Sequence, residues 1–113
     1  MQIQVIDQQQ VDPQRLRSMF IIRALRALDR LAPGILKIVG RFRDLNGPKG
    51  GVDHACTIEV ALRDGTRFRA EARAEQILTA LDDALGRLVR RIDSARKRQL
   101  TRRHDNLLAY DAG

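Results

Sequence analysis

The stretch from Glu75 to about Arg98 constrains the fold more than any other part of the chain, because it carries the most regular apolar pattern. Its apolar residues recur at steps of three and four, which places them on one side of a helix. These residues are Ile77, Leu78, Leu81, Ala84, Leu85, Leu88, Ile92 and Ala95. A single helix cannot bury its own apolar side, so another layer must cover it, and a sheet is the expected layer.

The opposite side of this helix is predicted to be cationic and exposed. On a helical wheel, its basic residues fall away from the apolar side. They are Arg87, Arg90, Arg91, Lys97 and Arg98. Asp83 lies one turn before Arg87 and is its expected local partner.

A second basic helix is predicted to begin at Asp12 and to run to about Leu31. The Asp12 side chain can accept hydrogen bonds from free backbone N–H groups of the first turn. Pro13 lacks an N–H, but at the first helical position this group would have no partner within the helix. Pro33 and Gly34 are expected to end this helix. Its apolar side comprises Leu16, Phe20, Ala24, Ala27, Leu28 and Leu31, and its basic flank comprises Arg15, Arg23, Arg26 and Arg30.

Four further segments alternate apolar and polar residues, which is the pattern of strands with one buried face. They span residues 2–5, 35–44, 56–63 and 67–73, and the first is expected near an edge of the sheet. The expected buried positions are Leu36, Ile38, Gly40 and Phe42, then Cys56, Ile58, Val60 and Leu62, and finally Phe68, Ala70 and Ala72. Thr57 and Glu59 are expected on the wet face. Asp64-Gly65 predicts a tight turn of the primed type between the last two strands.

The order of these elements predicts an α+β domain of β-α-β-β-β-α topology, with two helices packed on one face of a four-stranded sheet. A chain of 113 residues is long enough for one such domain, which is expected to span residues 1–98. Residues 99–113 keep some charge but lose the apolar period, so they are predicted to form a flexible basic tail.

The charge balance indicates a polyanionic partner. Lys and Arg number 21 against 14 Asp and Glu, which gives a formal net charge of +7. Such an imbalance favours nucleic acid first and an acidic membrane surface second. Aromatic residues make up only 4% of the chain, and this argues against a platform that stacks single-stranded bases. Phosphate contact by the arginines is therefore the expected mode, with simple solvation of the two helices as the alternative.

No enzymatic, metal or cofactor site is predicted. The glycine-rich segment 46–53 lacks a nucleotide-binding motif and is expected to be a hairpin loop, although Lys49 at its tip could touch a phosphate. His54, His104 and Cys56 have no metal-ligand spacing, and Cys56 is expected to be a buried, inert thiol. Asp82 and its neighbour Asp83 would point about 100° apart on a helix, which suits surface charges rather than a catalytic pair.

The location is expected to be cytoplasmic, with no membrane partner and no small-molecule substrate. The N-terminus has neither the basic region nor the apolar core of a signal peptide. A single cysteine cannot form an internal disulfide, and no apolar run approaches the length of about 20 residues that a membrane span needs.

Two segments resemble the ribosome hibernation-promoting factor family, also called ribosome-associated inhibitors or ribosomal subunit interface proteins. One is the loop Asn46-Gly47-Pro48-Lys49-Gly50-Gly51-Val52-Asp53. The other opens the last helix with Ala74, Glu75, Ala80, Leu81, Asp82 and Ala84. The resemblance covers about residues 1–98 and implies a β-α-β-β-β-α layer similar to double-stranded-RNA-binding domains.

The resemblance also implies a function. In this family the domain lies in the messenger and transfer RNA channel of the small ribosomal subunit, where basic helices grip ribosomal RNA and silence translation. By position, that role would fall to Arg87, Arg90, Arg91, Lys97 and Arg98, with Arg23, Arg26 and Arg30 as a lesser set. Long-form members add a C-terminal dimerisation domain, so this chain is expected to be a short form or a divergent paralogue, and a monomer when free.

The alternative is a protein-interaction adaptor, or a general RNA-binding module, of the same fold. In the adaptor, an unpaired strand edge and the residues Met19 and Ile22 would contact a protein while the arginines only confer solubility. Met19 and Ile22 fall off the apolar side of the first helix, and the pattern leaves their exposure open.

Overall fold

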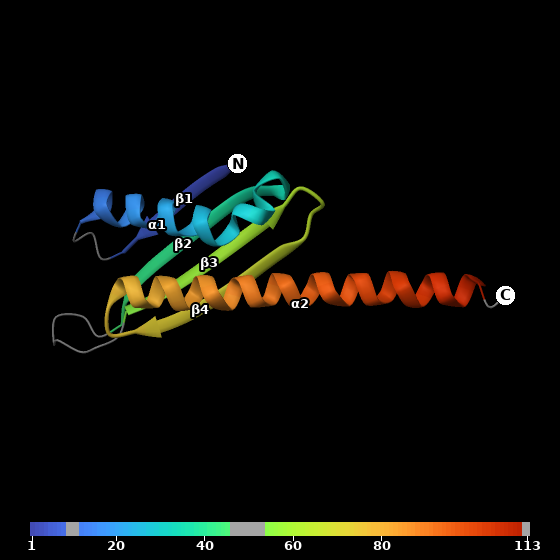
Figure 1. Cartoon of the computed structure of the whole chain (residues 1–113). Coiled ribbons are helices and arrows are strands. Elements are labelled where there is room, and N and C mark those ends of the chain that lie inside the picture. Colours follow the sequence, from blue (N-terminus) through green and yellow to red (C-terminus); the bar gives the residue numbers. More distant parts are fainter. Residues whose placement is uncertain (9–11, 46–53, 112–113) are drawn as a thin grey trace.

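Two helices cover one face of a four-stranded sheet in the computed structural model of this chain (Figure 1). The structure describes residues 1–8, 12–45 and 54–111, with the side chains of all of these except 32 and 102–111. The elements are β1 (Gln2–Asp7), α1 (Pro13–Leu28), a 3₁₀ helix η1 (Asp29–Gly34), β2 (Ile35–Asp44), β3 (His54–Leu62), β4 (Arg67–Ala74) and α2 (Ile77–Asp111). The predicted α+β class and β-α-β-β-β-α order are confirmed.

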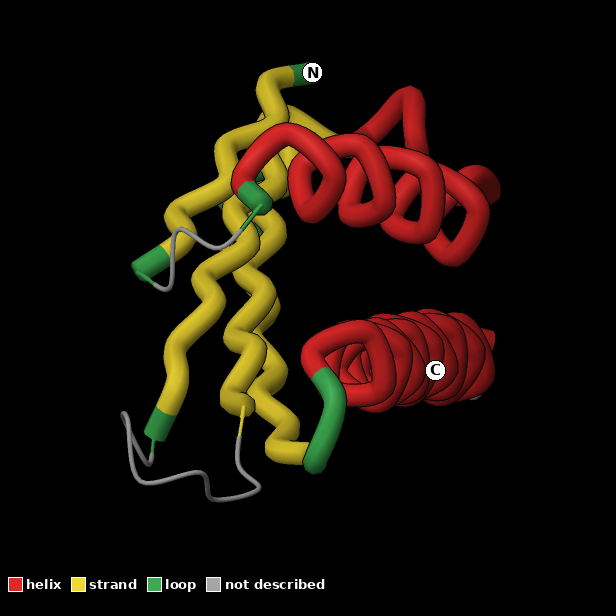
Figure 2. The backbone as a smooth tube through the Cα atoms, turned by 90° about the vertical axis from the view of Figure 1, so that its left-hand side faces the viewer, coloured by secondary structure: helices red, strands yellow, loops and turns green. Residues whose placement is uncertain are grey.

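The strands lie in the order β1-β2-β3-β4, so β1 and β4 form the two edges of the sheet. β1 runs parallel to β2, while β2, β3 and β4 pair antiparallel. A parallel pair needs a long crossover, and α1 supplies it. Both helices therefore lie on the same face, α1 near β1 and α2 over β3 and β4. No helix or strand of the described residues covers the other face, which we call the open face (Figure 2).

The core fills the space between the sheet and the helices, as the apolar periodicity predicts. α1 contributes Leu16, Phe20, Ala24 and Leu28, and α2 contributes Ala80, Leu81, Ala84, Leu85, Leu88 and Ile92. Asp12 accepts from the backbone N–H of Arg15 and begins α1, as predicted. Phe20 of α1 packs edge to face on Phe42 of β2, with ring centroids 5.9 Å apart and planes at 88°.

Gly40 lets α1 approach the sheet closely. A Cβ atom built at this position would lie 2.5 Å from Cε2 of Phe20, which is fully buried and cannot turn away. We expect Gly40→Ala to lower the free energy of unfolding by about 1–3 kcal/mol, the usual effect of overpacking a core. Gly34→Ala is the matched control, because nothing lies within 4 Å of its added Cβ. Urea unfolding midpoints compare the two, and equal midpoints would contradict the close approach.

The start of β2 departs from the predicted alternation. Leu36 was expected on the buried face, but 51% of it is exposed, so that prediction is wrong. The pairing register of β2 shifts between Ile35 and Lys37, which makes Leu36 the extra residue of a β-bulge. Because a shift of one residue exchanges the two faces, Ile35 takes the buried place instead.

Thr57 was expected on the wet face, yet only 4% of it is exposed. It does lie on the face away from the helices, directly between Arg41 of β2 and Glu71 of β4. β3 is a central strand, and long neighbouring side chains on both sides cover a small residue there. The open face is therefore partly covered by its own charged side chains.

The turn between β3 and β4 is not the predicted primed type. The N–H of Gly65 donates to the carbonyl of Leu62 at 3.0 Å, and the N–H of Leu62 donates to the carbonyl of Thr66 at 2.8 Å. These bonds close a three-residue loop in which Gly65, with φ of +91°, takes the left-handed conformation. The N–H of Thr66 also donates to Asp64, and this hydrogen bond lowers the pKa of the Asp64 carboxyl.

Both helices end differently from the prediction. α1 stops at Leu28, and the chain continues to Gly34 as the tighter helix η1, because Pro33 cannot fit an α-helical turn. α2 does not end near Arg98 but continues to Asp111 and runs on past the sheet (Figure 1). Residues 99–111 contain neither glycine nor proline, so the helix persists where its apolar period stops. Flexibility of this segment stays a prediction.

No helix among the described residues combines the length and the hydropathy needed to cross a membrane.

Candidate nucleic-acid interface

Helix α2 carries the predicted basic residues along its outer side. Its buried side packs on β3 and β4 as far as Ile92, which is 1% exposed. Arg87, Arg90, Arg91, Lys97 and Arg98 are all exposed, as the helical wheel predicts. Beyond Ile92 the sheet no longer covers the helix, so residues 96–101 are exposed all round.

The basic residues of α2 line a first groove, which runs between α2 and the edge strand β4. It has a volume of about 570 Å³ and is lined by Phe68, Arg87, Arg90, Arg91, Ser94 and Arg98. Arg87 donates to the backbone carbonyl of Glu71 at 2.9 Å, and Arg91 donates to the carbonyl of Arg69. Carbonyls are neutral, so both guanidinium groups keep their full charge while being held along the strand.

These two contacts correct one expectation about the site. Arg87 does not pair with Asp83, since its guanidinium reaches β4 instead. The two hydrogen bonds also occupy backbone carbonyls of the edge strand β4. Free carbonyls of an edge strand would otherwise be able to pair with a strand of another protein. The protein-docking edge of the adaptor alternative is thus partly filled at β4.

A second groove lies between the outer surfaces of α1 and α2. It has a volume of about 580 Å³ and is lined by Arg23, Arg26, Ala27, Asp82, Leu85, Gly86, Val89 and Arg90. Arg90 lines both grooves and so lies at the centre of the basic surface. Nη1 of Arg90 is 3.6 Å from where a Cβ of Gly86 would be, which is an ordinary van der Waals distance, so the guanidinium lies beside Gly86.

Two of the predicted site residues form ion pairs, contrary to expectation. The arginines of both helices were expected to have too few acidic neighbours for pairing. Arg23 of α1 nevertheless pairs with Asp82 of α2, and Arg30 of η1 pairs with Asp93 of α2 at 3.5 Å. Exposed pairs of this kind contribute at most about 1 kcal/mol to stability, but they neutralise the local charge.

The remaining cations are uncompensated. Within the described residues, no ion pair involves Arg26, Arg90, Lys97 or Arg98. Arg96, which the sequence analysis did not assign to the site, is equally exposed. Its wheel position is close to the apolar side, and only the end of the sheet near Ile92 places it in solvent. Lys49 lies outside the described residues.

The thiol that was considered for other chemistry is not reactive in this fold. Cys56 is fully buried, as predicted, and burial, with the nearby charge of Glu71, raises the pKa of its thiol to about 12. Such a thiol stays protonated and unreactive at neutral pH. The described residues contain no group of three or more His, Cys, Asp or Glu side chains that could hold a metal ion. The side chain of His104 lies outside the described part.

Comparisons with known proteins support the fold. No protein-family model matches this chain, and no curated protein matches it. Among solved structures, it is similar to a ribosomal subunit interface protein from Coxiella burnetii, with a TM-score of 0.69 and 20% identity over 86% of this chain and 99% of that chain. It is also similar to the N-terminal domain of Thermus thermophilus Protein Y, with a TM-score of 0.63 and 23% identity over 81% and 96% of the two chains. This chain therefore has the fold of these two proteins, which is the fold implied by the sequence resemblance.

Proposed function

We propose that this protein is a ribosome-associated hibernation factor that binds ribosomal RNA of the small subunit in the messenger and transfer RNA channel. One observation carries the proposal. A fold shared with a ribosomal subunit interface protein presents uncompensated cations around Arg90, in two grooves that meet at this residue. The proposed action is occupation of the channel by shape and charge rather than catalysis, in the cytoplasm and by a monomer.

Phosphates are the proposed ligands of this surface. Arg26, Arg90, Lys97 and Arg98 are the principal proposed contacts, because they are exposed and form no ion pair among the described residues. Arginine suits this role because its planar group can bind two phosphate oxygens at once. Arg87 and Arg91 contribute their remaining N–H groups, whereas Arg23 and Arg30 are already neutralised by carboxylates. A contact by Lys49 stays a prediction.

Sedimentation through a sucrose gradient tests the proposal. The protein should move with the small subunit or the whole ribosome at low salt, and it should leave that fraction as salt rises, because phosphate contacts release counterions. Ribosomes loaded with messenger and transfer RNA should exclude it if it occupies the channel. Protein that stays at the top of the gradient at low salt would refute ribosome association, and equal binding to loaded ribosomes would refute the channel.

A protein-interaction adaptor is the second candidate, favoured by apolar exposure on α1. Ile22 is 49% exposed and Leu25 is 38% exposed, while Met19 is partly buried. Replacing Ile22 with Ser distinguishes the candidates, since an adaptor would lose its partner and a phosphate-binding surface would not change its salt dependence.

A further inference from the structure

The open face of the sheet, opposite the helices, is also basic. Side chains at alternate strand positions point to this face. Its cations are Lys37, Arg41 and Arg43 of β2 and Arg67, Arg69 and Arg73 of β4, and its carboxylates are Glu59 of β3 and Glu71 of β4. The proposed ribosomal site uses none of these residues, because it lies on the helices.

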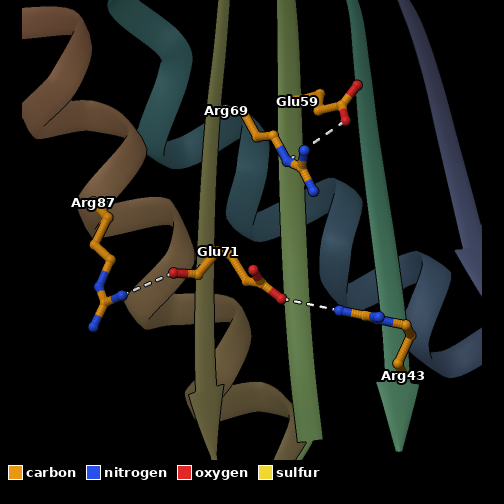
Figure 3. A network of polar contacts seen from close by, with 5 residues as sticks. All are labelled: Arg43, Glu59, Arg69, Glu71 and Arg87. Atoms are coloured by element: carbon orange, nitrogen blue, oxygen red, sulfur yellow. Dashed lines mark hydrogen bonds and ion pairs between the residues drawn. The ribbon is translucent and has the colours of Figure 1, made fainter.

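Two ion pairs neutralise part of this charge. Arg43 pairs with Glu71 at 3.0 Å, and Arg69 approaches Glu59 at 3.8 Å (Figure 3). Figure 3 also shows that Glu71 turns its carboxylate to Arg43 while its backbone carbonyl accepts from Arg87 of α2. Both carboxylates of the face are thus already engaged.

Four cations of this face remain without an ion pair among the described residues, namely Lys37, Arg41, Arg67 and Arg73. Three of them line a hollow of about 480 Å³, together with the paired Glu59 and Arg69 and with apolar side chains such as Val39. A surface with this excess of positive charge is complementary to a polyanion.

The spacing of these cations lets them contact separate phosphates of one nucleic-acid duplex. Lys37 and Arg67 lie two strands apart, about 10 Å, and Arg41 lies four residues from Lys37 along β2, about 13 Å. Phosphates of a duplex follow one another closely along both strands, so cations at these separations reach different phosphates of one backbone. None of the strand positions on this face is aromatic, which argues against stacking of single-stranded bases.

An acidic peptide fits this face less well. Extended peptides bind sheets chiefly at an edge, where backbone groups are free to form hydrogen bonds. β2 and β3 lie inside the sheet and are paired with a neighbour on each side.

We propose that the open sheet face is a second phosphate-binding surface that takes the backbone of an RNA duplex. Because the helices and the open face look in opposite directions, the protein binds two RNA segments at once and bridges them (Figure 2). This goes beyond the proposed function, for which the helical surface alone suffices.

A bridging assay tests this inference with the full chain. Short RNA duplexes labelled with either a donor or an acceptor fluorophore are mixed with the protein, and energy transfer reports two duplexes on one molecule. We expect transfer at one protein per two duplexes and its decline when protein is in excess. A wild-type protein that binds only one duplex would overturn the proposal.

The variant Arg41→Glu with Arg67→Glu locates the second surface. Both residues are exposed and form no ion pair, so the fold should be retained, which circular dichroism and a thermal melt check. Bridging should be lost while one duplex still binds. The matched control, Arg17→Glu with Arg63→Glu, changes the net charge equally at exposed positions outside both surfaces and should keep bridging.

Each outcome separates this inference from the proposed function. Bridging that is retained in the sheet variant refutes the second RNA-binding surface. If, in addition, a labelled polyglutamate peptide binds the wild type but not this variant, the open face binds an acidic peptide instead of RNA. Ribosome association is measured separately by sedimentation of the wild type. Bridging without sedimentation would refute the ribosomal role and leave the second surface standing.

Discussion

Replacing Arg90 and Arg98 with glutamate is expected to weaken binding to the small ribosomal subunit by about 3 kcal/mol or more, roughly a hundredfold or more in Kd. Both residues line the groove beside β4, both are exposed, and neither forms an ion pair among the described residues. Each lost contact to a phosphate removes a charge-assisted hydrogen bond, and the new carboxylate repels the backbone. The dependence of log Kd on log salt should also become shallower by somewhat under one unit for each contact.

The control for this variant is again Arg17→Glu with Arg63→Glu, which alters the net charge by the same amount. Arg17 is exposed on α1 and lines neither groove, and Arg63 is exposed in the loop between β3 and β4. Filter binding or sedimentation over a series of salt concentrations measures both proteins. An equal loss of affinity and salt slope in the two variants would mean that net charge alone drives binding, without a site on α2.

Replacing Leu88 with aspartate is expected to unfold the domain. Leu88 is completely buried in the part of α2 that packs against the sheet. Removing its apolar side chain alone would cost about 2–5 kcal/mol, and an unpaired carboxylate adds the cost of burying a charge. Domains of this size have only about 5–15 kcal/mol of stability in total. The cooperative thermal transition followed by circular dichroism should therefore disappear.

Two controls separate loss of packing from a general effect of substitution in α2. Leu88→Met keeps the volume and the apolar character of the side chain and should cost less than about 1.5 kcal/mol. Thr79→Asp places the same charge on the exposed side of the first turn of α2 and should leave the melt unchanged. A cooperative melt of Leu88→Asp at the wild-type temperature would contradict the packing of α2 on the sheet.

Local patterns were sufficient to predict most of the fold. The buried sides of α1 and α2 and the strands β3 and β4 agree with their periodicities, because the side-chain direction repeats with the secondary structure itself. The β-bulge at Leu36 could not be predicted, since it depends on how β2 pairs with β3. The predicted end of α2 was wrong because the apolar periodicity indicates only where the helix packs on the sheet. That packing stops near Ile92, although the helix continues.

For the candidate site, too, the helical period predicted one part and tertiary packing decided the other. The sequence by itself determined that a helix over about residues 75–98 would be basic on the side away from its core, because that depends only on the helical period. Only the tertiary structure decided which arginines keep their charge unpaired. Arg23 meets Asp82 across 59 residues of sequence, and Arg87 reaches β4 rather than Asp83. Such partners depend on how α1 and α2 pack on one sheet, and the spacing of residues along the sequence does not predict these contacts.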